Sequence, residues 1–244
     1  MSNSIEVINL SKTYKENQAV KNISFKVNRN EIIGLLGPNG CGKTTTIAMI
    51  LGLLKPSEGK VLINSKNIED HRINLLHKMN FISPYIELPK KLTVKQNLIV
   101  YGKLYSVKNL SDRIEYLSEK LRLNKFIDNI TGELSSGQKN RVSLAKSLIN
   151  DPTVLLLDEP TASLDPETGD FVRTFLEEYK VEKKISILLA SHNMDEVKRL
   201  CSSVLMMKDG NIIDSGSPKE LIKKHGRENL EEVFLKLVRN QNES

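Results

Sequence analysis

The apolar and polar positions of this 244-residue chain follow different periods in different stretches. Near the N-terminus, Ile5–Val7 and Ile23–Val27 alternate apolar with polar residues, which predicts half-buried antiparallel strands. Two later runs, Val154–Leu157 and Ile185–Ala190, are apolar at every position, which suits central parallel strands covered by helices on both faces. The pattern therefore predicts an α/β fold with an antiparallel β part.

Between Leu88 and Ile149 the apolar residues recur at helical spacing instead. We interpret this stretch as a helical subdomain of about residues 86–150, inserted into a single domain that spans residues 1–244. It closes where Ser135, a favoured N-cap residue, opens a helix with one apolar face. Since a helix start offers unpaired N–H donors, this one either holds an anion or is simply a capped helix.

The loop after the apolar run Ile32–Leu36 has the composition of a phosphate-binding loop. A helical pattern follows it, and its candidate ligand-binding residues are Gly37, Pro38, Asn39, Gly40, Cys41, Gly42, Lys43, Thr44 and Thr45. Glycines let the backbone turn its N–H groups toward an anion, Lys43 would reach the outer phosphates, and the Thr44 hydroxyl would contact Mg²⁺. The alternative is a chance glycine-rich turn. A phosphate loop by itself indicates only that a nucleoside triphosphate is bound, so it does not distinguish kinases, GTPases and motor ATPases.

Polar residues follow both of the fully apolar runs. Asp158 and Glu159 come after Val154–Leu157, where the carboxyl ends of parallel strands border a ligand crevice. Because side chains alternate along a strand, we expect one carboxylate to approach a metal and the other an attacking water. His192 follows the run Ile185–Ala190 and is a candidate phosphate contact, although a lone histidine is often a surface or core residue.

Two further residues near the phosphate loop have open interpretations. Tyr14, with Lys12 and Lys15 beside it, either stacks on a purine base or packs on its own sheet. Cys41 lies just before a helix start, which lowers a thiol pKa, so we expect it to be alkylated readily and protected by nucleotide. The alternative for Cys41 is an inert small residue.

Composition and charge limit the classes of partner and the compartment expected for this chain. The net charge is +6, but the lysines are scattered in pairs and aromatic residues make up only 5% of the chain, so we expect no nucleic-acid platform. No apolar run approaches the roughly 20 residues of a membrane span, and the first residues do not resemble a signal peptide. With Cys41 and Cys201 as the only cysteines, no structural disulfide is expected and the cytosol is the expected compartment.

Five motifs taken together carry a resemblance that no one of them carries alone. In chain order they are the phosphate loop, Leu134–Gln138 (LSSGQ), Leu155–Pro160 (LLLDEP), Ser163–Asp165 and Ser191–His192. This series resembles the nucleotide-binding subunit of an ATP-binding cassette (ABC) transporter over essentially the whole chain. The resemblance implies a RecA-like P-loop NTPase core, an antiparallel β subdomain and an inserted α-helical subdomain. It also implies an ATPase with ATP and Mg²⁺ at its site.

The resemblance also implies a role for each motif residue. Lys43 and the backbone of Gly40–Thr45 would hold the phosphates, and Thr44 and Asp158 would serve Mg²⁺. Glu159 would be the general base, His192 would contact the γ-phosphate, and Tyr14 fits the adenine-stacking aromatic. The residues expected at the ATP of the opposite subunit, or at the dimer seam, are Ser135, Gly137, Gln138 and Asp165.

Two positions depart from the family pattern. Ser136 stands where the signature usually has a glycine, and Pro84 stands where the family has a glutamine near the metal. A glutamine ligand to Mg²⁺ is therefore not expected. In the family this loop faces the membrane subunit, so we expect Pro84, Tyr85 and Ile86 to take part in coupling rather than in hydrolysis.

The resulting hypothesis is an ATPase subunit, peripheral on the cytoplasmic face of the cell membrane. It would form a homodimer, or pair with another ABC subunit, around ATP and power a separate transmembrane permease subunit. The segments Ser191–Glu196 and Asn229–Phe234 look most like those of ABC-2-type exporters. One alternative is a non-transport ABC ATPase acting in cytosolic assembly, translation or DNA repair. A second is a small-molecule kinase, which should lack the LSSGQ helix start.

Overall fold

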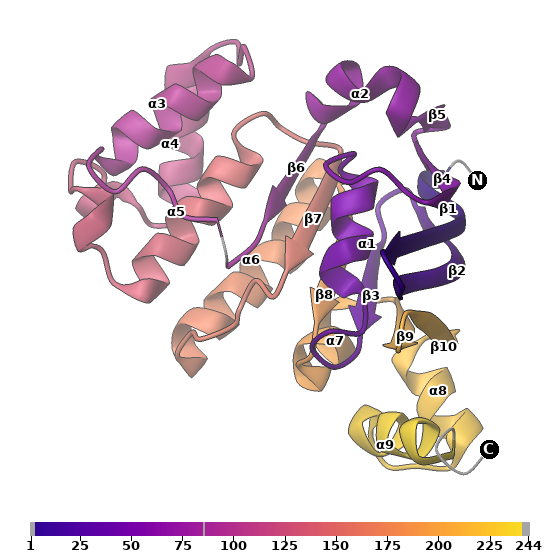
Figure 1. The fold of residues 1–244 in the computed structure, drawn as a ribbon. Coiled ribbons are helices and arrows are strands. Elements are labelled where there is room, and N and C mark those ends of the chain that lie inside the picture. Colours follow the sequence, from indigo (N-terminus) through magenta and orange to yellow (C-terminus); the bar gives the residue numbers. More distant parts are fainter. Residues whose placement is uncertain (1–2, 85, 241–244) are drawn as a thin grey trace. The chain divides into compact units, whose positions relative to one another are not determined.

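The computed structural model describes residues 3–84 and 86–240 (Figure 1), so the expectation for Tyr85 lies outside the described residues. The chain divides into two compact units. Unit 1 comprises Met1–Leu75 and Ser186–Ser244, and unit 2 comprises Leu76–Ile185.

An antiparallel sheet in unit 1 contains the predicted N-terminal strands. Its order is β2-β1-β4-β5, formed by β1 (Asn3–Tyr14), β2 (Asn17–Asn28), β4 (Glu58–Ile63) and β5 (Lys66–Asn67). β1 and β2 extend well beyond the runs that alternate in sequence. The reason is a set of register shifts along the pair, with positive φ at Asn9 and Asn22, because each shift breaks the two-residue period.

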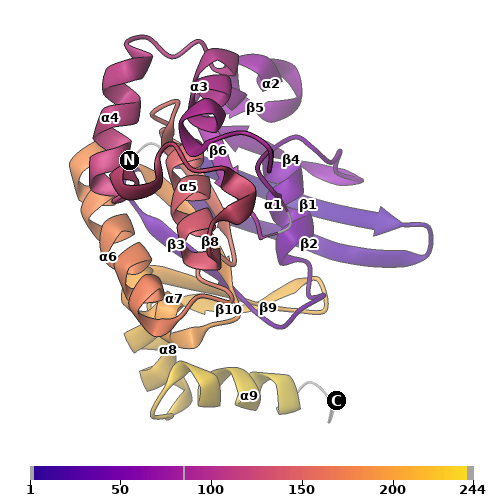
Figure 2. The ribbon, with the colours of Figure 1, turned by 90° about the vertical axis from the view of Figure 1, so that its left-hand side faces the viewer.

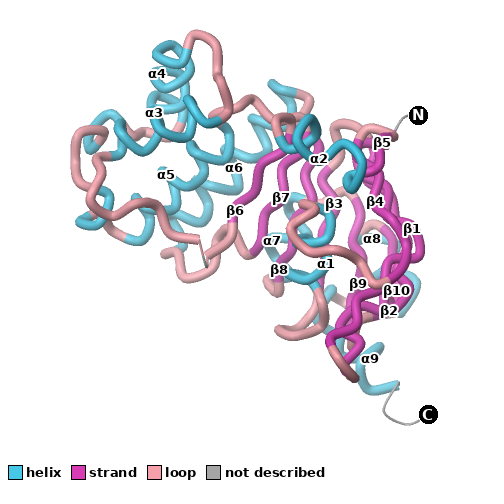
Figure 3. The backbone as a smooth tube through the Cα atoms, turned by 45° about the horizontal axis from the view of Figure 1, so that its top comes forward, coloured by secondary structure: helices cyan, strands magenta, loops and turns pink. Residues whose placement is uncertain are grey.

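A second set of strands in unit 1 supports the phosphate loop (strands magenta in Figure 3). Its order is β10-β9-β3-β8, formed by β3 (Ile32–Leu36), β8 (Ser186–Ser191), β9 (Ser203–Lys208) and β10 (Asn211–Gly216). β3 is parallel to both β8 and β9, and all of its residues are buried, as its continuous apolar run requires. β9 and β10 are antiparallel across Asp209–Gly210, a residue pair typical of tight hairpin turns.

Unit 1 also contains helices that connect or follow these strands. They are α1 (Lys43–Ile50), α2 (Ile68–Leu76, whose last residue belongs to unit 2), α7 (Met194–Leu200), α8 (Pro218–His225) and α9 (Leu230–Asn240). α9 buries Leu230 and Val233, so its apolar stripe faces its own unit. Among the described residues, no helix is both long enough and apolar enough to cross a membrane.

Unit 2 combines two parallel strands with helices. Its elements are β6 (Met79–Ile82), α3 (Val94–Leu104), α4 (Leu110–Lys120), the 3₁₀ turns η1 (Asn124–Phe126) and η2 (Thr131–Glu133), α5 (Ser136–Leu148), β7 (Val154–Asp158) and α6 (Pro166–Lys183). α3, α4 and α5 lie side by side (Figure 2). The structure groups them with β6, β7 and α6, and the limits of about 86–150 for an inserted subdomain stay a prediction.

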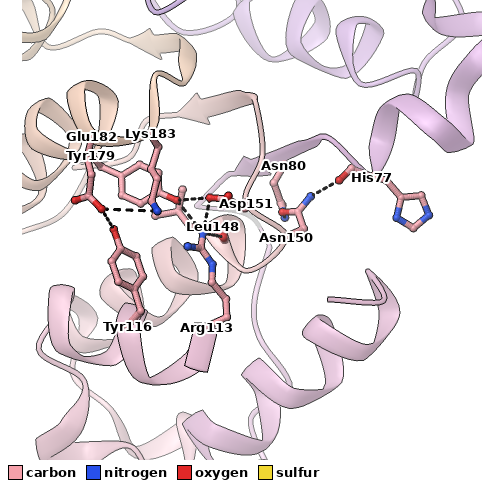
Figure 4. Close-up of polar contacts among 10 residues, drawn as sticks. All are labelled: His77, Asn80, Arg113, Tyr116, Leu148, Asn150, Asp151, Tyr179, Glu182 and Lys183. Carbon is pink, nitrogen blue, oxygen red and sulfur yellow. Dashed lines mark hydrogen bonds and ion pairs between the residues drawn. The ribbon is translucent and has the colours of Figure 1, made fainter. Parts of the chain in front are cut away.

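Polar contacts fix the C-terminal end of α5 (Figure 4). The Arg113 guanidinium on α4 donates to the Leu148 carbonyl and, at 2.8 Å, to the Tyr179 hydroxyl on α6. Burial raises the pKa of Tyr179 to about 12, so this hydroxyl stays protonated at neutral pH. Just after α5, the Asn150 side chain donates to the carbonyls of His77 and Met79 at 3.0 and 3.1 Å. The end of α5 is thereby tied to α4, α6 and β6.

Candidate functional site

The phosphate loop lies in unit 1 between β3 and α1. Gly40 and Gly42 have φ of 82° and 107°, in the left-handed region that favours glycine. Gly42 is also the N-cap of α1, so no side chain caps the first turn and the first turn carries no acidic residue. The first amides of α1 therefore present their N–H groups and the positive end of the helix dipole to the loop, an arrangement suited to an anion.

Close packing explains two of the loop glycines. A Cβ on Gly37 would lie 2.3 Å from the Met207 carbonyl oxygen, and one on Gly42 would lie 2.6 Å from the Ala19 carbonyl oxygen. Both neighbours are backbone atoms that cannot swing aside. A Cβ on Gly40 would meet nothing within 4 Å, so this glycine is required by its φ alone. The loop is held close to β9 and β2 at two of its glycines and is open at the third.

Lys43 is buried, with 5% of its surface exposed, and its ammonium lies over the loop. It donates to the carbonyl oxygens of Gly37 and Pro38 at 2.6 and 3.1 Å. Thr44 is exposed and Thr45 is half-buried at the start of α1, while Pro38, Asn39 and Gly40 are exposed. An ammonium, an exposed threonine and the first amides of α1 are thus collected at one end of one helix.

The structure contradicts the expectation that Cys41 is reactive. Its side chain is only 3% exposed, and burial raises the pKa of its thiol, an effect that the nearby Lys43 charge reduces without overcoming. A Cβ on Gly37 would lie 2.7 Å from Cys41 Sγ, which shows how tightly the sulfur is packed beneath the loop. The dipole argument was wrong here because desolvation of the thiolate outweighs it.

Tyr14 and His192 also lie in unit 1. Tyr14 ends β1 with 47% of its surface exposed, and Lys12 Nζ lies 5.3 Å from its ring centroid. His192 is exposed directly after β8 and borders a cavity of about 400 Å³ that also touches Asn229 and Leu230 of the α9 start. Asn193 caps α7 by accepting from Asp195 and Glu196 amides, so the histidine backbone is anchored on both sides.

The sequence suggested that Asp158 and Glu159 lie on one strand, but in unit 2 only Asp158 belongs to it. β7 ends at Asp158, whose side chain is 2% exposed, and Glu159 has a φ of 51°. This left-handed backbone costs of order 1–3 kcal/mol in a residue with a side chain and is a common mark of functional sites. The two carboxylates therefore differ in direction because the chain turns between them, rather than because strand side chains alternate.

The signature segment forms a capping box at the start of α5. The Ser135 hydroxyl accepts from the Gln138 amide at 3.2 Å, and the Gln138 side chain accepts from the Ser135 amide at 2.9 Å. This confirms Ser135 as the N-cap. Gly137 is buried, and a Cβ there would lie 3.0 Å from the Thr168 hydroxyl on α6. Ser135 and Ser136 are exposed, so the start of α5 faces outward.

Asp165 is confirmed as the N-cap of α6, with Pro166 in the first turn. Its carboxylate accepts from the Thr168 amide at 2.9 Å, and hydrogen bonds from the Thr168 backbone and side chain lower its pKa. The exposed carboxylate therefore stays charged well below neutral pH.

A cavity of about 230 Å³ inside unit 2 brings together residues from three motifs. Pro84, Ser136, Asn140 and Glu159 all line it. Both departures from the family pattern thus border the same cavity as the candidate base. Pro84 lies in a turn closed by a 3.2 Å hydrogen bond from the Ile86 amide to the Ser83 carbonyl, and it offers no side-chain ligand.

Asn140 is a candidate site residue that the sequence motifs did not identify. Its side-chain amide donates to the Pro160 carbonyl at 2.7 Å and so joins α5 to the turn after β7. One signal was present in the sequence, because Asn140 follows Ser136 by four residues and four residues bring a helix back to the same face. That signal gives the direction of the side chain but not its partner.

Comparisons with known proteins converge on one family. A family model described as ABC transporter matches residues 20–162. The ABC transporter ATP-binding protein NatA of Bacillus subtilis is 34% identical over 226 residues, which is 91% of this chain and 92% of that protein. The Nod factor export ATP-binding protein I of Rhizobium johnstonii is 37% identical over 221 residues, which is 89% of this chain and 70% of that protein.

Solved structures give the same result. The ATP-binding subunit of an ABC transporter is 26% identical with a TM-score of 0.88, covering 96% of this chain and 99% of that chain. The structure of cbiO1 from Clostridium perfringens, part of the ABC transporter complex cbiONQ, is 32% identical with a TM-score of 0.81, covering 92% of each. A dimeric ATP-binding cassette bound to ADP and Pi is 25% identical with a TM-score of 0.80, covering 87% and 98%. These likenesses confirm the predicted fold class.

Proposed function

The chain belongs to the ATP-binding subunits of ABC transporters, and we propose that it is an exporter-type subunit that closes into a dimer around ATP and drives a separate transmembrane subunit. It is an ATPase of this family. The exporter assignment is supported by relatives whose names describe Nod factor export. The dimer and the membrane partner are supported by the dimeric cassette and by the cbiO1 complex.

One observation supports the dimer from this chain itself. The start of α5 carries Ser135 and Ser136 on the surface of unit 2, and the start of α1 carries Lys43 and the loop glycines in unit 1. Each unit thus presents one helix start suited to an anion. In a symmetric pair of subunits, each ATP can be held by the loop of one subunit and capped by the Ser135 segment of the other.

The proposed chemistry is phosphoryl transfer to water, in which positioning and charge stabilisation supply most of the catalysis. Lys43 and the α1 amides hold the phosphates, and Tyr14 stacks on the adenine. Glu159 orients the attacking water and accepts its proton. His192 holds the γ-phosphate, while Asp165 lies at the dimer seam beside Ser135, Gly137 and Gln138.

Mg²⁺ fits the oxygen groups of this chain. The exposed Thr44 hydroxyl and the buried Asp158 carboxylate are hard oxygen donors, which Mg²⁺ prefers, and it commonly keeps several waters. The ion would neutralise charge that develops on the phosphates. Because Pro84 has no side-chain donor or acceptor, a water would take the place of a glutamine ligand.

The proposed location is the cytoplasmic face of the cell membrane, on a transmembrane partner. The Pro84 turn and the neighbouring Ile86 are proposed to take part in coupling to that partner. Purification from detergent-solubilised membranes tests this part, because a cytosolic assembly, translation or repair factor would not copurify with an integral membrane protein. Replacing Pro84 with alanine should leave the ATPase rate of the isolated subunit within a few-fold and weaken its stimulation by the partner.

The Glu159→Gln variant tests the core of the proposal. Amidation keeps the shape of the side chain and removes its basicity, so ATP·Mg²⁺ should drive this variant into a stable dimer on gel filtration while hydrolysis stops. The exposed first-turn acid of α6, altered as Glu167→Gln, is the matched control and should behave like the parent. A Glu159→Gln protein that stays monomeric with ATP bound, or hydrolyses at the parental rate, contradicts the assignment.

A further inference from the structure

The side chain of Asn140 connects two segments of unit 2 to which the proposed function gives different roles. It lies on α5, five residues after Ser135, or about 7.5 Å along the helix axis. From there its amide nitrogen donates to the Pro160 carbonyl at 2.7 Å. Pro160 directly follows the candidate base Glu159, so the signature helix holds the backbone of the turn that carries the base.

That turn needs support from outside. Glu159 has a left-handed backbone with a φ of 51°, which persists only when the surroundings fix it. Within the turn, the Ala162 amide donates to the Glu159 carbonyl at 3.1 Å. Pro160 has no N–H to contribute, so its carbonyl is its one backbone hydrogen-bonding group, and Asn140 donates to it.

The turn also has room to move if this support is lost. Glu159 and Asn140 line the same cavity of about 230 Å³, together with Ser136 of α5. A tightly packed turn would stay in place after one lost hydrogen bond, whereas a turn beside a cavity can relax into it. A carboxylate that must orient a water is sensitive to such a shift, because a misplacement of about 1 Å can cost about 100-fold in rate.

We infer that Asn140 is a positioning residue for Glu159 of the same subunit, and that it transmits the position of the α5 start to the base. The inference rests on the proposed dimer, in which the α5 start contacts the ATP of the opposite subunit. Binding of that ATP fixes α5, α5 fixes the Pro160 carbonyl through Asn140, and the carbonyl fixes Glu159. One ATP site thereby prepares the base of the other.

Asn150 supplies a matched control for a purely structural amide. It is also an asparagine that donates to backbone carbonyls, those of His77 and Met79, but it lies beyond the opposite end of α5 from Ser135 (Figure 4). Replacing either asparagine with alanine removes a half-buried donor and lowers stability. Only Asn140 contacts the turn that carries Glu159, so only its loss should change turnover selectively.

The first experiment compares the ATPase kinetics of four variants. Asn140→Asp keeps the size of the side chain but removes the donor and places a charge near the Pro160 carbonyl, so kcat should fall about 10- to 100-fold with little change in KM. The kcat of Asn140→Ala should fall by a similar factor. Asn140→Gln keeps the donor on a longer side chain, so its kcat should lie between those of Asn140→Ala and the parent. Asn150→Ala should keep kcat at the parental level despite a lower Tm. Parental kcat in Asn140→Asp, or a loss in Asn150→Ala as large as in Asn140→Ala, overturns the inference.

The second experiment places the substitution in one subunit of a dimer at a time. Two affinity tags allow isolation of mixed dimers in which one subunit carries Glu159→Gln, so that only the other subunit supplies a base. Asn140→Asp on the subunit that keeps Glu159 should lower the remaining activity about 10- to 100-fold, whereas the same change on the Glu159→Gln subunit should leave it unchanged. The reverse pattern, or equal losses, overturns the inference.

ATP-driven dimer formation separates this inference from the function on which it rests. Asn140→Asp combined with Glu159→Gln should still form the ATP dimer, because Ser135 and the α5 start are intact. If Glu159→Gln alone forms no dimer, the proposed function fails. If it does form one and the combined variant does not, Asn140 supports the dimer rather than the base, and the inference fails by itself.

Discussion

The two units of this chain build their candidate nucleotide-binding groups in different ways. In unit 1 the loop is made of backbone, with glycines fixed by φ and by carbonyl oxygens as close as 2.3 Å to where a Cβ would stand. In unit 2 the start of α5 is made of side chains, with Ser135 and Gln138 bonded to each other's amides. An added Cβ at Gly37 or Gly42 meets backbone that cannot swing aside, while side-chain sites tolerate shape changes and depend on particular donors and acceptors.

Glycine replacement should show the largest difference between the units. Gly37→Ala forces a Cβ against the Met207 carbonyl, and displacement of the loop should weaken ATP binding by about 100-fold, the equivalent of roughly 3 kcal/mol. Gly137→Ala meets the Thr168 side chain at 3.0 Å, which can rotate, so its effect on ATP-driven dimer formation should stay below about tenfold. Calorimetric titration with ATP and gel filtration measure the two effects, with circular dichroism as the check on folding. Equal losses of ATP binding and of dimer formation in the two variants would contradict the difference proposed between the two units.

The two capping boxes of unit 2 separate the stability of a cap from its contact with ligand. Thr93 and Gln96 cap α3 as Ser135 and Gln138 cap α5. Ser135→Ala and Thr93→Ala should each lower the free energy of unfolding by about 1 kcal/mol. Ser135→Ala should also weaken ATP-driven dimerisation about tenfold or more, because in the proposed dimer it removes a hydroxyl that would bond to a charged phosphate, a contact worth about 1.5–3 kcal/mol.

Gel filtration of Ser135→Ala and Thr93→Ala over a range of ATP concentrations, beside urea unfolding of both, tests this pair. If Thr93→Ala weakens the dimer as much as Ser135→Ala does, the loss follows from stability and the ligand contact is not needed. The pair has matched geometry, since both boxes contain both reciprocal hydrogen bonds.

Cys41 tests how tightly the backbone-built loop is packed. Because burial raises its pKa, less thiolate is present at pH 8 than for an ordinary cysteine, and alkylation should be at least about tenfold slower than for free cysteine. The rate should keep rising with pH beyond about 9, where a free thiol levels off. Mass spectrometry of iodoacetamide-treated protein, with Cys41→Ser to assign the signal against the buried Cys201, measures this rate. Labelling at the rate of free cysteine would contradict the packing.

The smallest expected effect is that of Ser136→Gly, which restores the residue usual in the family. The side chain is exposed in the first turn of α5, so its loss should lower stability by only a few tenths of a kcal/mol, as glycine does in a helix. The ATPase rate should stay within about threefold of the parent in a coupled assay. A larger change would mean that the Ser136 hydroxyl acts in the cavity that it shares with Glu159.

The features that could be predicted from the sequence are those that depend on local spacing. Apolar runs located β3, β7 and β8, and the capping residues Ser135 and Asp165 located two helix starts, because these depend on local spacing. The left-handed Glu159 could not be predicted, since glutamate carries no preference for that backbone. The burial of Cys41 and the partner of Asn140 depend on segments distant in the sequence, which no local pattern reports.

The bonds of Lys43 to the Gly37 and Pro38 carbonyls have a consequence for ligand binding. The ammonium donates to both oxygens from a side chain that is 5% exposed, so the loop itself helps to hold it in place. In the proposed ATPase, a phosphate that contacts this ammonium would meet a charge already in position, and little of the entropy of ordering a long side chain would have to be lost on binding.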